Sequence, residues 1–242
     1  MNKPITLITF VLVSALTAFS QKTAPTQTTP SAADKDAAVA LAKAALAAHG
    51  GDKFKQMKSI VMKGSVDLNV MNQVVPGAFS IAMAGEKYYF EINSIVQSVK
   101  QICDGQQTYS SIQGFMIPPP TSVGFEVLAR VGDAGYAITS YGDDKKKRKG
   151  FRITAPDGFY TDFFVDDKTG QIKGYESAFE VGQRLITTSA QFDSFETVEG
   201  VVVPKKYSQR FDLGNLTAYA NFNTKDIKVN PEMDASAFAI PH

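Results

Sequence analysis

The sequence has very few of the residues on which catalytic and metal sites most often depend. Its 242 residues include one cysteine, two histidines and no tryptophan. A single cysteine excludes an intramolecular disulfide framework and any zinc site built on several cysteines. The histidines, His49 and His242, stand at the end of an expected helix and at the end of the chain, where neither is well placed as a catalytic base. We therefore expect no catalytic residues, no metal site and no cofactor.

Local catalytic motifs are also absent. The sequence contains no glycine-rich phosphate loop, no G-x-S-x-G elbow and no paired-histidine metal motif. The carboxylate pairs Asp143-Asp144 and Asp166-Asp167 stand in turn-like sequence, which is typical of solvated turn residues rather than of a catalytic cleft. A calcium contact at the second pair stays open, although the full loop signature is missing. These absences predict a protein that is not an enzyme.

The start of the chain has the pattern of an export signal. Lys3 precedes the apolar run Ile5–Phe19, and Ala18-Phe19-Ser20 offers small residues for cleavage. The run is shorter than the ~20 residues that span a bilayer, so we interpret residues 1–20 as a signal peptide, with a retained anchor as the alternative. Residues 21–33 are rich in Thr, Pro, Ala and Gln and predict a disordered spacer. The expected location is periplasmic.

Charge gives little support for a nucleic-acid partner. The chain has 25 Lys and Arg against 24 Asp and Glu, and loss of Lys3 with the signal peptide leaves it formally neutral. Phosphate backbones require a net basic surface, so we expect no nucleic-acid binding. The basic run Lys145, Lys146, Lys147, Arg148 and Lys149 predicts either contact with a membrane surface or envelope protein, or a solvated turn balanced by Asp143 and Asp144. Cys103 is expected to be a buried, inert thiol.

Periodicity predicts a mostly antiparallel α+β fold. A slim, alanine-rich helix with Asp34 and Asp36 in its first turn ends at Gly50-Gly51, and a short helical turn Asp52–Met57 follows. From Ser59 onward apolar residues alternate with polar ones, in about eleven strands joined by hairpin turns. This pattern is typical of a half-open, curved β-barrel whose concave face has to be covered.

One short helix interrupts the strands. Pro118-Pro119-Pro120 predicts a rigid extended segment, after which Thr121 or Ser122 caps a helix that runs through Phe125, Leu128 and Val131 to Gly132. Together with the N-terminal helix, this central helix is expected to cover the concave face. Because both helices are slim, we expect them to leave apolar space inside.

The order of several short motifs resembles LolA/LolB-like lipoprotein-carrier domains, the outer-membrane lipoprotein-sorting superfamily. The motifs are Ala47-Ala48-His49-Gly50-Gly51, the strand Ile60-x-Met62-Lys63-Gly64-x-Val66, the hairpin Phe164-Val165-Asp166-x-x-Thr169-Gly170, the strand start Glu199-Gly200-Val201-x-Val203-Pro204, and the ending Ile227-x-Val229-Asn230-Pro231 with Phe238-x-Ile240-Pro241. The resemblance covers about residues 34–242, which we expect to form one domain. It implies an incomplete β-barrel with an apolar cavity that carries acyl chains or binds lipoprotein-like ligands across the periplasm. The long spacer and the Pro118–Pro120 segment depart from the pattern.

The resulting hypothesis is a carrier or binding protein for lipoprotein acyl chains, lipid or another apolar ligand. Its expected cavity lining comes from one face of three strands: Met62, Phe79, Ile81, Met83, Tyr88, Phe90 and Ile92. Phe125 and Leu128 are expected to belong to a lid. The alternative is an envelope sensor or regulatory binding module of the same fold, without a transport role.

Overall fold

The structure is a computed structural model that describes residues 32–70, 73–96, 98–112, 117–143, 148–181, 184–212 and 217–241. The predicted signal peptide, residues 21–31 of the predicted spacer, Lys145–Lys147 and His242 lie outside the described residues. The helix expected from Asp34 begins slightly earlier, at Ala32, so the spacer was drawn two residues too long. Within the described ranges, no helix is long and apolar enough to cross a membrane.

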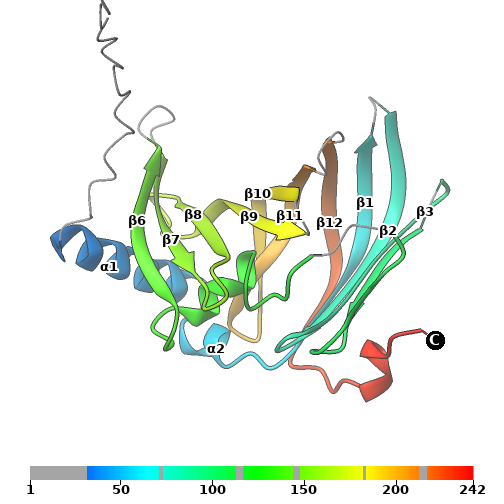
Figure 1. Cartoon of the computed structure of the whole chain (residues 1–242), viewed down its shortest axis with the longest axis horizontal. Helices are drawn as coiled ribbons and strands as arrows, with labels where there is room; N and C mark the ends of the chain where they lie inside the picture. Colours follow the sequence, from blue (N-terminus) through cyan, green and yellow to red (C-terminus); the bar gives the residue numbers. More distant parts are fainter. Residues whose placement is uncertain are drawn as a thin grey trace, which may run out of the picture.

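Twelve antiparallel strands form one open, strongly curved sheet, which confirms the predicted fold class (Figure 1). Its order is β5-β4-β3-β2-β1-β12-β11-β10-β9-β8-β7-β6, so the edge strands β5 and β6 do not pair with each other. Neighbours along the sheet are neighbours in sequence except where β1 pairs with β12. The strands are β1 Ile60–Val70, β2 Gln73–Ala84, β3 Lys87–Ser94, β4 Ser98–Cys103, β5 Thr108–Ser110, β6 Ala137–Asp143, β7 Arg148–Thr154, β8 Tyr160–Val165, β9 Ile172–Val181, β10 Arg184–Val198, β11 Val201–Asp212 and β12 Thr217–Val229.

The N-terminal helix α1 (Ala32–Ala48) covers the concave face beside β6 and β7. Its buried side consists of small residues, Ala38, Ala42 and Ala45, with Leu46 near its end. The helix closes as predicted, because Gly51 N–H bonds Leu46 O and Gly50 N–H bonds Ala47 O while Gly50 adopts a φ of 110°. Alanine lets the helix axis approach the sheet closely, and the short helix α2 (Asp52–Lys55) then leads into β1.

His49 links the end of α1 to the two strands β9 and β11 through hydrogen bonds. Its Nδ1 lies 2.9 Å from Val202 O, and Ile172 N–H donates to its Nε2 at 3.0 Å, so the ring is neutral with the proton on Nδ1. The imidazole is fully buried and packs edge-on against Phe125 and Phe195. Burial lowers the pKa of His49, which keeps the ring neutral. The structure thus supports the structural role expected for this histidine.

Residues 117–131, here called the strap, cross the concave face between the two arms of the curved sheet. At one end Tyr88 Oη donates to Ile117 O at 2.6 Å, and Gln101 Oε1 accepts Ile117 N–H. At the other end Gly124 N–H donates to Thr161 Oγ1 at 3.1 Å. The strap ends in a short 3₁₀ helix, η1 (Phe125–Arg130), visible between the arms in Figure 1.

The expected cap of this central helix was wrong. Gly124 is its N-cap and no side chain bonds the helix start. The Ser122 hydroxyl is instead donated to Asp157 on the β7–β8 turn, and the Thr121 carbonyl accepts a hydrogen bond from Tyr136. Both residues therefore tie the strap to the sheet rather than capping η1.

The convex face carries a smaller cluster near the C-terminus. The 3₁₀ helix η2 (Ala235–Phe238) packs Phe238 against Ala82 and Ile102 on the outside of the sheet. Figure 1 shows this segment lying outside β3. Phe238 thereby helps to bury Ala82 and Ile102, which point away from the concave face.

Replacing His49 by Phe should lower the free energy of unfolding by about 2 kcal/mol above pH 7, because Ile172 N–H and Val202 O lose a buried partner while ring volume is kept. Since the folded-state pKa of His49 lies below its usual 6.5, wild-type His49 binds more protons when unfolded, and its contribution is lost as pH falls below about 6.5. The stability difference between the two proteins, measured by urea unfolding, should therefore shrink at acid pH. A difference that is constant from pH 8 to pH 5 would contradict the assignment.

Candidate ligand-binding cavity

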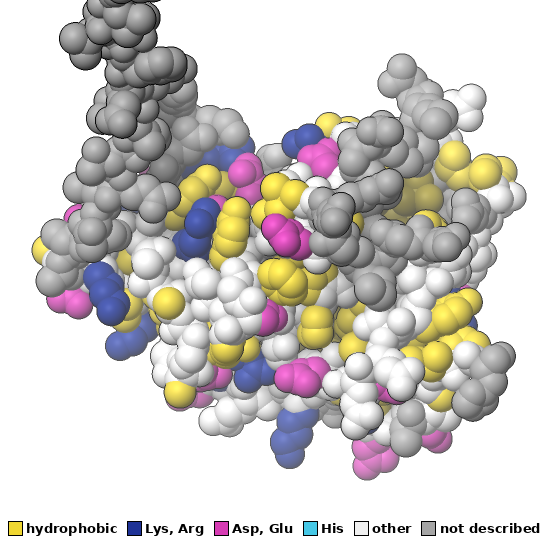
Figure 2. Space-filling view, in the orientation of Figure 1, with side chains coloured by type: hydrophobic (Ala, Val, Ile, Leu, Met, Phe, Trp, Pro, Cys, Tyr) yellow, Lys and Arg dark blue, Asp and Glu magenta, His cyan; other side chains and the backbone are white. Residues whose placement is uncertain are grey.

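A cavity of about 140 Å³ lies between the strap, α2 and the inner face of the sheet. Strands from both arms contribute to it, β1 to β3 on one side and β9 to β11 on the other. Its lining is predominantly apolar and includes Phe54, Met57, Ile60, Met62, Ile81, Met83, Phe90, Ile117, Pro118, Val123, Phe125, Phe192, Val203 and Phe211. Hydrophobic side chains also reach the surface at the right of Figure 2, on the side of β1 to β3. The strap thus covers a predominantly apolar hollow.

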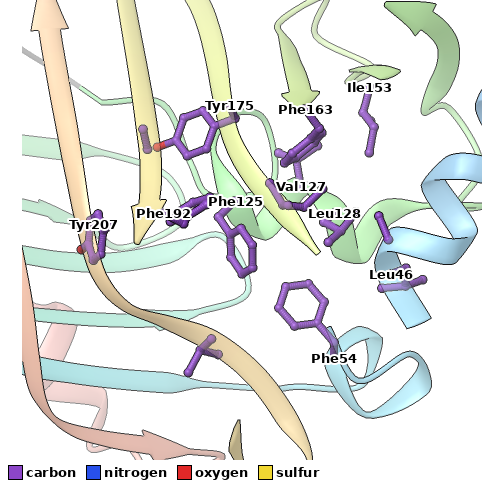
Figure 3. Packing of buried hydrophobic residues seen from close by; sticks show 14 of the residues in the cluster. Leu46, Phe54, Phe125, Val127, Leu128, Ile153, Phe163, Tyr175, Phe192 and Tyr207 are labelled. Atoms are coloured by element: carbon purple, nitrogen blue, oxygen red, sulfur yellow. The ribbon is translucent and has the colours of Figure 1, made fainter. Parts of the chain in front are cut away.

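Aromatic rings form one wall of this cavity. Phe125 on η1 lies at 5.5 Å, ring centre to ring centre, from Phe54 on α2 and at 5.2 Å from Phe192 on β10 (Figure 3). Phe192 in turn contacts Tyr175 and Tyr207, whose rings lie 6.0 and 6.1 Å away. Edge-to-face and tilted contacts of this kind are favoured between aromatic rings and add to the stability that burial supplies.

A second hollow of about 170 Å³ adjoins the first. Both are lined by Phe54, Met57, Ile60, Met83, Pro120 and Glu126. The second hollow is more polar, because Lys55, Lys58 and Arg130 contribute to it. Lys55 Nζ is bound to Val131 O at 2.8 Å and to Asp133 at 2.7 Å, and Arg130 also contacts Asp133. The apolar cavity therefore continues toward solvent through this second, more polar hollow, here called the antechamber.

Glu126 on η1 stands where the two hollows meet. Among the described residues that line the apolar cavity, it alone carries a formal charge. Its side chain is half-buried, and its remaining exposed surface faces the hollows it lines. Burial raises the pKa of Glu126 to about 7, opposed only by a hydrogen bond from its own backbone N–H. The cavity thus contains a carboxyl group that can exchange a proton near neutral pH.

Polar groups of β9, β10 and β11 lie across the cavity from the apolar strands. Gln209 Nε2 donates to Tyr175 Oη and to Thr188 Oγ1, both at 3.2 Å. Burial raises the pKa of Tyr175 and of Tyr207, and the negative charge of Glu126 adds to both shifts. Both phenols therefore remain protonated hydrogen-bond donors, and the cavity has one polar side.

The expected lining residues divide into two groups. Met62, Ile81, Met83, Tyr88 and Phe90 line the cavity, because the register places Met62 opposite Ile81 and Ile81 opposite Phe90 on the inner face. Phe79 and Ile92 face the same way but lie in the packed core, where Phe79 contacts Phe222 edge-on. Whether any of these residues binds a ligand stays a prediction.

The two expected lid residues also differ. Phe125 borders the cavity, whereas Leu128 is fully buried in the core beside Val127. Sequence reasoning missed the contributions of α2 and of β9 to β11, and it missed Glu126. A single acid in the apolar stretch Val123–Leu128 was the available signal for Glu126.

Other sequence predictions have clear structural counterparts. Cys103 is a buried free thiol, as expected. Asp166 accepts the backbone N–H groups of Lys168 and Thr169, so it is a turn residue, and hydrogen bonds lower its pKa. In the described part of the basic run, Arg148 pairs with Glu176 at 3.0 Å. Lys149 approaches Asp167 at 3.6 Å.

No cluster of three or more metal-ligating side chains occurs within the ranges that the structure describes. A third hollow of about 690 Å³ is lined by charges of both signs, including Arg148, Lys173, Glu176 and Arg210. Its mixed charges and open, polar character distinguish it from the apolar cavity, which is the candidate site on physical grounds.

A scan against models of protein families finds no match, and a search of curated proteins finds none either. Similar solved structures include a DUF1329 family protein from Desulfovibrio piger, with 10% identity, 85% of this chain and 97% of that chain covered, and a TM-score of 0.49. A LolA superfamily protein from Nitrosomonas europaea matches with 11% identity over 81% of this chain and 97% of that one, with a TM-score of 0.48. An outer membrane lipoprotein-sorting protein domain from Vibrio parahaemolyticus matches with 10% identity over 84% and 97%, with a TM-score of 0.44.

The last two are described in the terms of the superfamily that the sequence motifs resemble. Because all three TM-scores are below 0.5, the function proposed below rests on the cavity itself.

Replacing Glu126 by Gln should stabilise the protein at alkaline pH. Because the folded-state pKa of about 7 exceeds the ordinary 4.5, the folded protein binds more protons, and stability falls as pH rises from about 4.5 to 7. Glu126→Gln should therefore exceed wild type in free energy of unfolding by about 2 kcal/mol at pH 8 and match it at pH 4.5, as measured by urea unfolding. Glu86→Gln, at an exposed position, is the control and should show no such pH-dependent difference in stability from wild type. Equal stability of wild type and Glu126→Gln at pH 8 would contradict the buried carboxylate.

Proposed function

We propose that this protein is a periplasmic binding or carrier protein for an apolar ligand, such as a lipoprotein acyl chain or another lipid. The observation that carries the proposal is an apolar cavity that the strap covers and that opens toward solvent. A covered apolar hollow is costly to leave empty, since its walls lose contacts that a ligand would restore. A few polar groups on one side can orient such a ligand.

The free-energy gain for a chain is large compared with the cost of a few hydrogen bonds. Each buried CH₂ group contributes roughly 0.8 kcal/mol. A cavity of about 140 Å³ resembles an engineered cavity of ~150 Å³ that holds benzene, so it fits the end of a chain and not a whole acyl group. A longer chain would extend into the antechamber or displace part of the strap.

The strap supplies the proposed lid, and its two halves are not equivalent. Ile117 to Pro120 is half-buried and held mainly through Tyr88 and Gln101. Withdrawing Val127 and Leu128, both fully buried, would cost about 1.5–3 kcal/mol for each side chain. We therefore propose that the segment before η1 moves, while η1 stays docked with Phe125 against the ligand.

A sensor or regulatory binding module is the second candidate. The cavity is smaller than the ~300–1,000 Å³ typical of sites that enclose a drug-sized ligand. A site that grips one small apolar group suits recognition of a partner as well as transport. The membrane or envelope contact of the basic run Lys145–Lys149 stays a prediction under either function.

Filling the cavity should abolish ligand binding without unfolding the protein. Ile81→Trp adds bulk on the inner face at a half-buried position between Met62 and Phe90. Native mass spectrometry of protein purified from its host should show co-purified lipid on the wild type and at least a tenfold smaller lipid-bound fraction on Ile81→Trp.

Ser80→Trp is the matched control, because the neighbouring residue on the same strand points to the opposite face. It should retain the lipid. Equal lipid occupancy on both variants would rule out the cavity as the binding site, and a stoichiometric protein partner without lipid would favour the sensor.

A further inference from the structure

The described lining of the cavity carries one formal charge, and that charge is negative. Glu126 is the single formally charged residue among the described residues that line it, and no Lys or Arg in that lining compensates it. Lys55 and Arg130, which line the adjoining antechamber, are both engaged by Asp133. Lys58, also in the antechamber, is exposed to solvent. Within the described part of the chain, the Glu126 carboxylate is thus left without a paired cation.

The groups that face Glu126 from the sheet are neutral. Tyr175 on β9 and Tyr207 on β11 interact electrostatically with it, and burial keeps both phenols protonated. No described side chain donates a hydrogen bond to the carboxylate; its own backbone N–H is the donor that acts on it. An unpaired carboxylate in apolar surroundings is unfavourable, and burial accordingly moves its pKa toward neutrality.

Aromatic rings line the same cavity as Glu126. Phe125 adjoins Glu126 in η1, and Phe192, Tyr175 and Tyr207 form the wall described above. Aromatic faces attract cations through their quadrupoles, and they do so most strongly in desolvated sites. A carboxylate beside several rings is therefore a favourable environment for an ammonium group and an unfavourable one for an anion.

We propose that the preferred ligand is a cationic amphiphile: an apolar chain that ends in a protonated amine, with the amine paired to Glu126 and the chain lying between Met62, Ile81 and Phe90. This inference rests on the proposed function, since it names the ligand class for the same cavity. It also predicts weaker binding of a free fatty acid, because the carboxylate of the fatty acid would be repelled by the like charge of Glu126.

Three ligands of equal chain length test the charge preference. Octylamine, 1-octanol and octanoate are titrated by calorimetry into wild type, Glu126→Gln and Glu86→Gln at pH 8, where Glu126 is mostly ionised and an alkylamine is protonated as lysine is. Wild type should bind octylamine about tenfold more tightly than 1-octanol, as expected for a charge-assisted hydrogen bond, and octanoate most weakly. Glu126→Gln should bind amine and alcohol with equal affinity.

Glu86→Gln removes an exposed carboxylate outside the cavity lining and should keep the amine preference. Loss of the preference in this variant to the same extent as in Glu126→Gln would overturn the assignment to the carboxylate. If all three ligands bind equally, or octanoate binds best, the cationic specificity is wrong while the proposed function stands. If none binds to wild type, the proposed function fails together with it. Thermal unfolding of each variant verifies that it is folded.

Discussion

The feature on which the rest of the structure depends is the need to cover the inner face of a large open sheet. Twelve strands curve around more apolar surface than α1 can bury, because that helix presents mostly alanine and lies mainly against β6 and β7. The strap covers the remainder by crossing from Tyr88 and Gln101 on one arm to Thr161 on the other. Although Thr121 and Ser122 also tie the strap to its surroundings between these ends, an apolar cavity remains beneath it.

Two titratable groups near the strap, His49 and Glu126, have opposite effects on the stability of the fold. His49 is satisfied at both ring nitrogens and supports the join between α1 and the sheet, so its burial stabilises the fold as long as the ring is neutral. Among the described residues Glu126 has no such side-chain partners, and its ionised form is disfavoured by the same apolar surroundings. The contrast separates a structural group from a candidate functional one. A buried polar side chain whose hydrogen-bonding groups are all paired within the fold has a structural role. A polar side chain left unpaired beside a cavity is instead a candidate for contact with a ligand.

Much of the fold could be predicted from the sequence because alternation and turn chemistry are local. The period-two pattern of β1 to β3 correctly predicted that Met62, Ile81 and Phe90 share one face of the sheet. Gly50-Gly51 correctly predicted the end of the first helix. The site was less accessible, since its other wall comes from β9 to β11 and from α2, which approach β1 to β3 only after the sheet curves. Thr121 and Ser122 resemble caps in sequence, yet Tyr136 and Asp157 bind them, and these partners lie on other elements. Long-range partners of this kind leave no mark in local periodicity.

The position of Glu126 also bears on how a ligand could leave. An apolar chain held by burial alone is released slowly, because its dissociation has to return every buried CH₂ group to water. A carboxyl group whose pKa is near 7 changes its charge over a narrow pH range, and protonation would remove the attraction for an ammonium group while leaving the apolar contacts unchanged. The polar antechamber with Lys55 and Arg130 lies next to this carboxyl group, so proton exchange does not require the strap to open. In the proposed carrier, binding strength and access to the cavity would thereby be controlled by different parts of the same segment, Glu126 on η1 and the residues from Ile117 to Pro120.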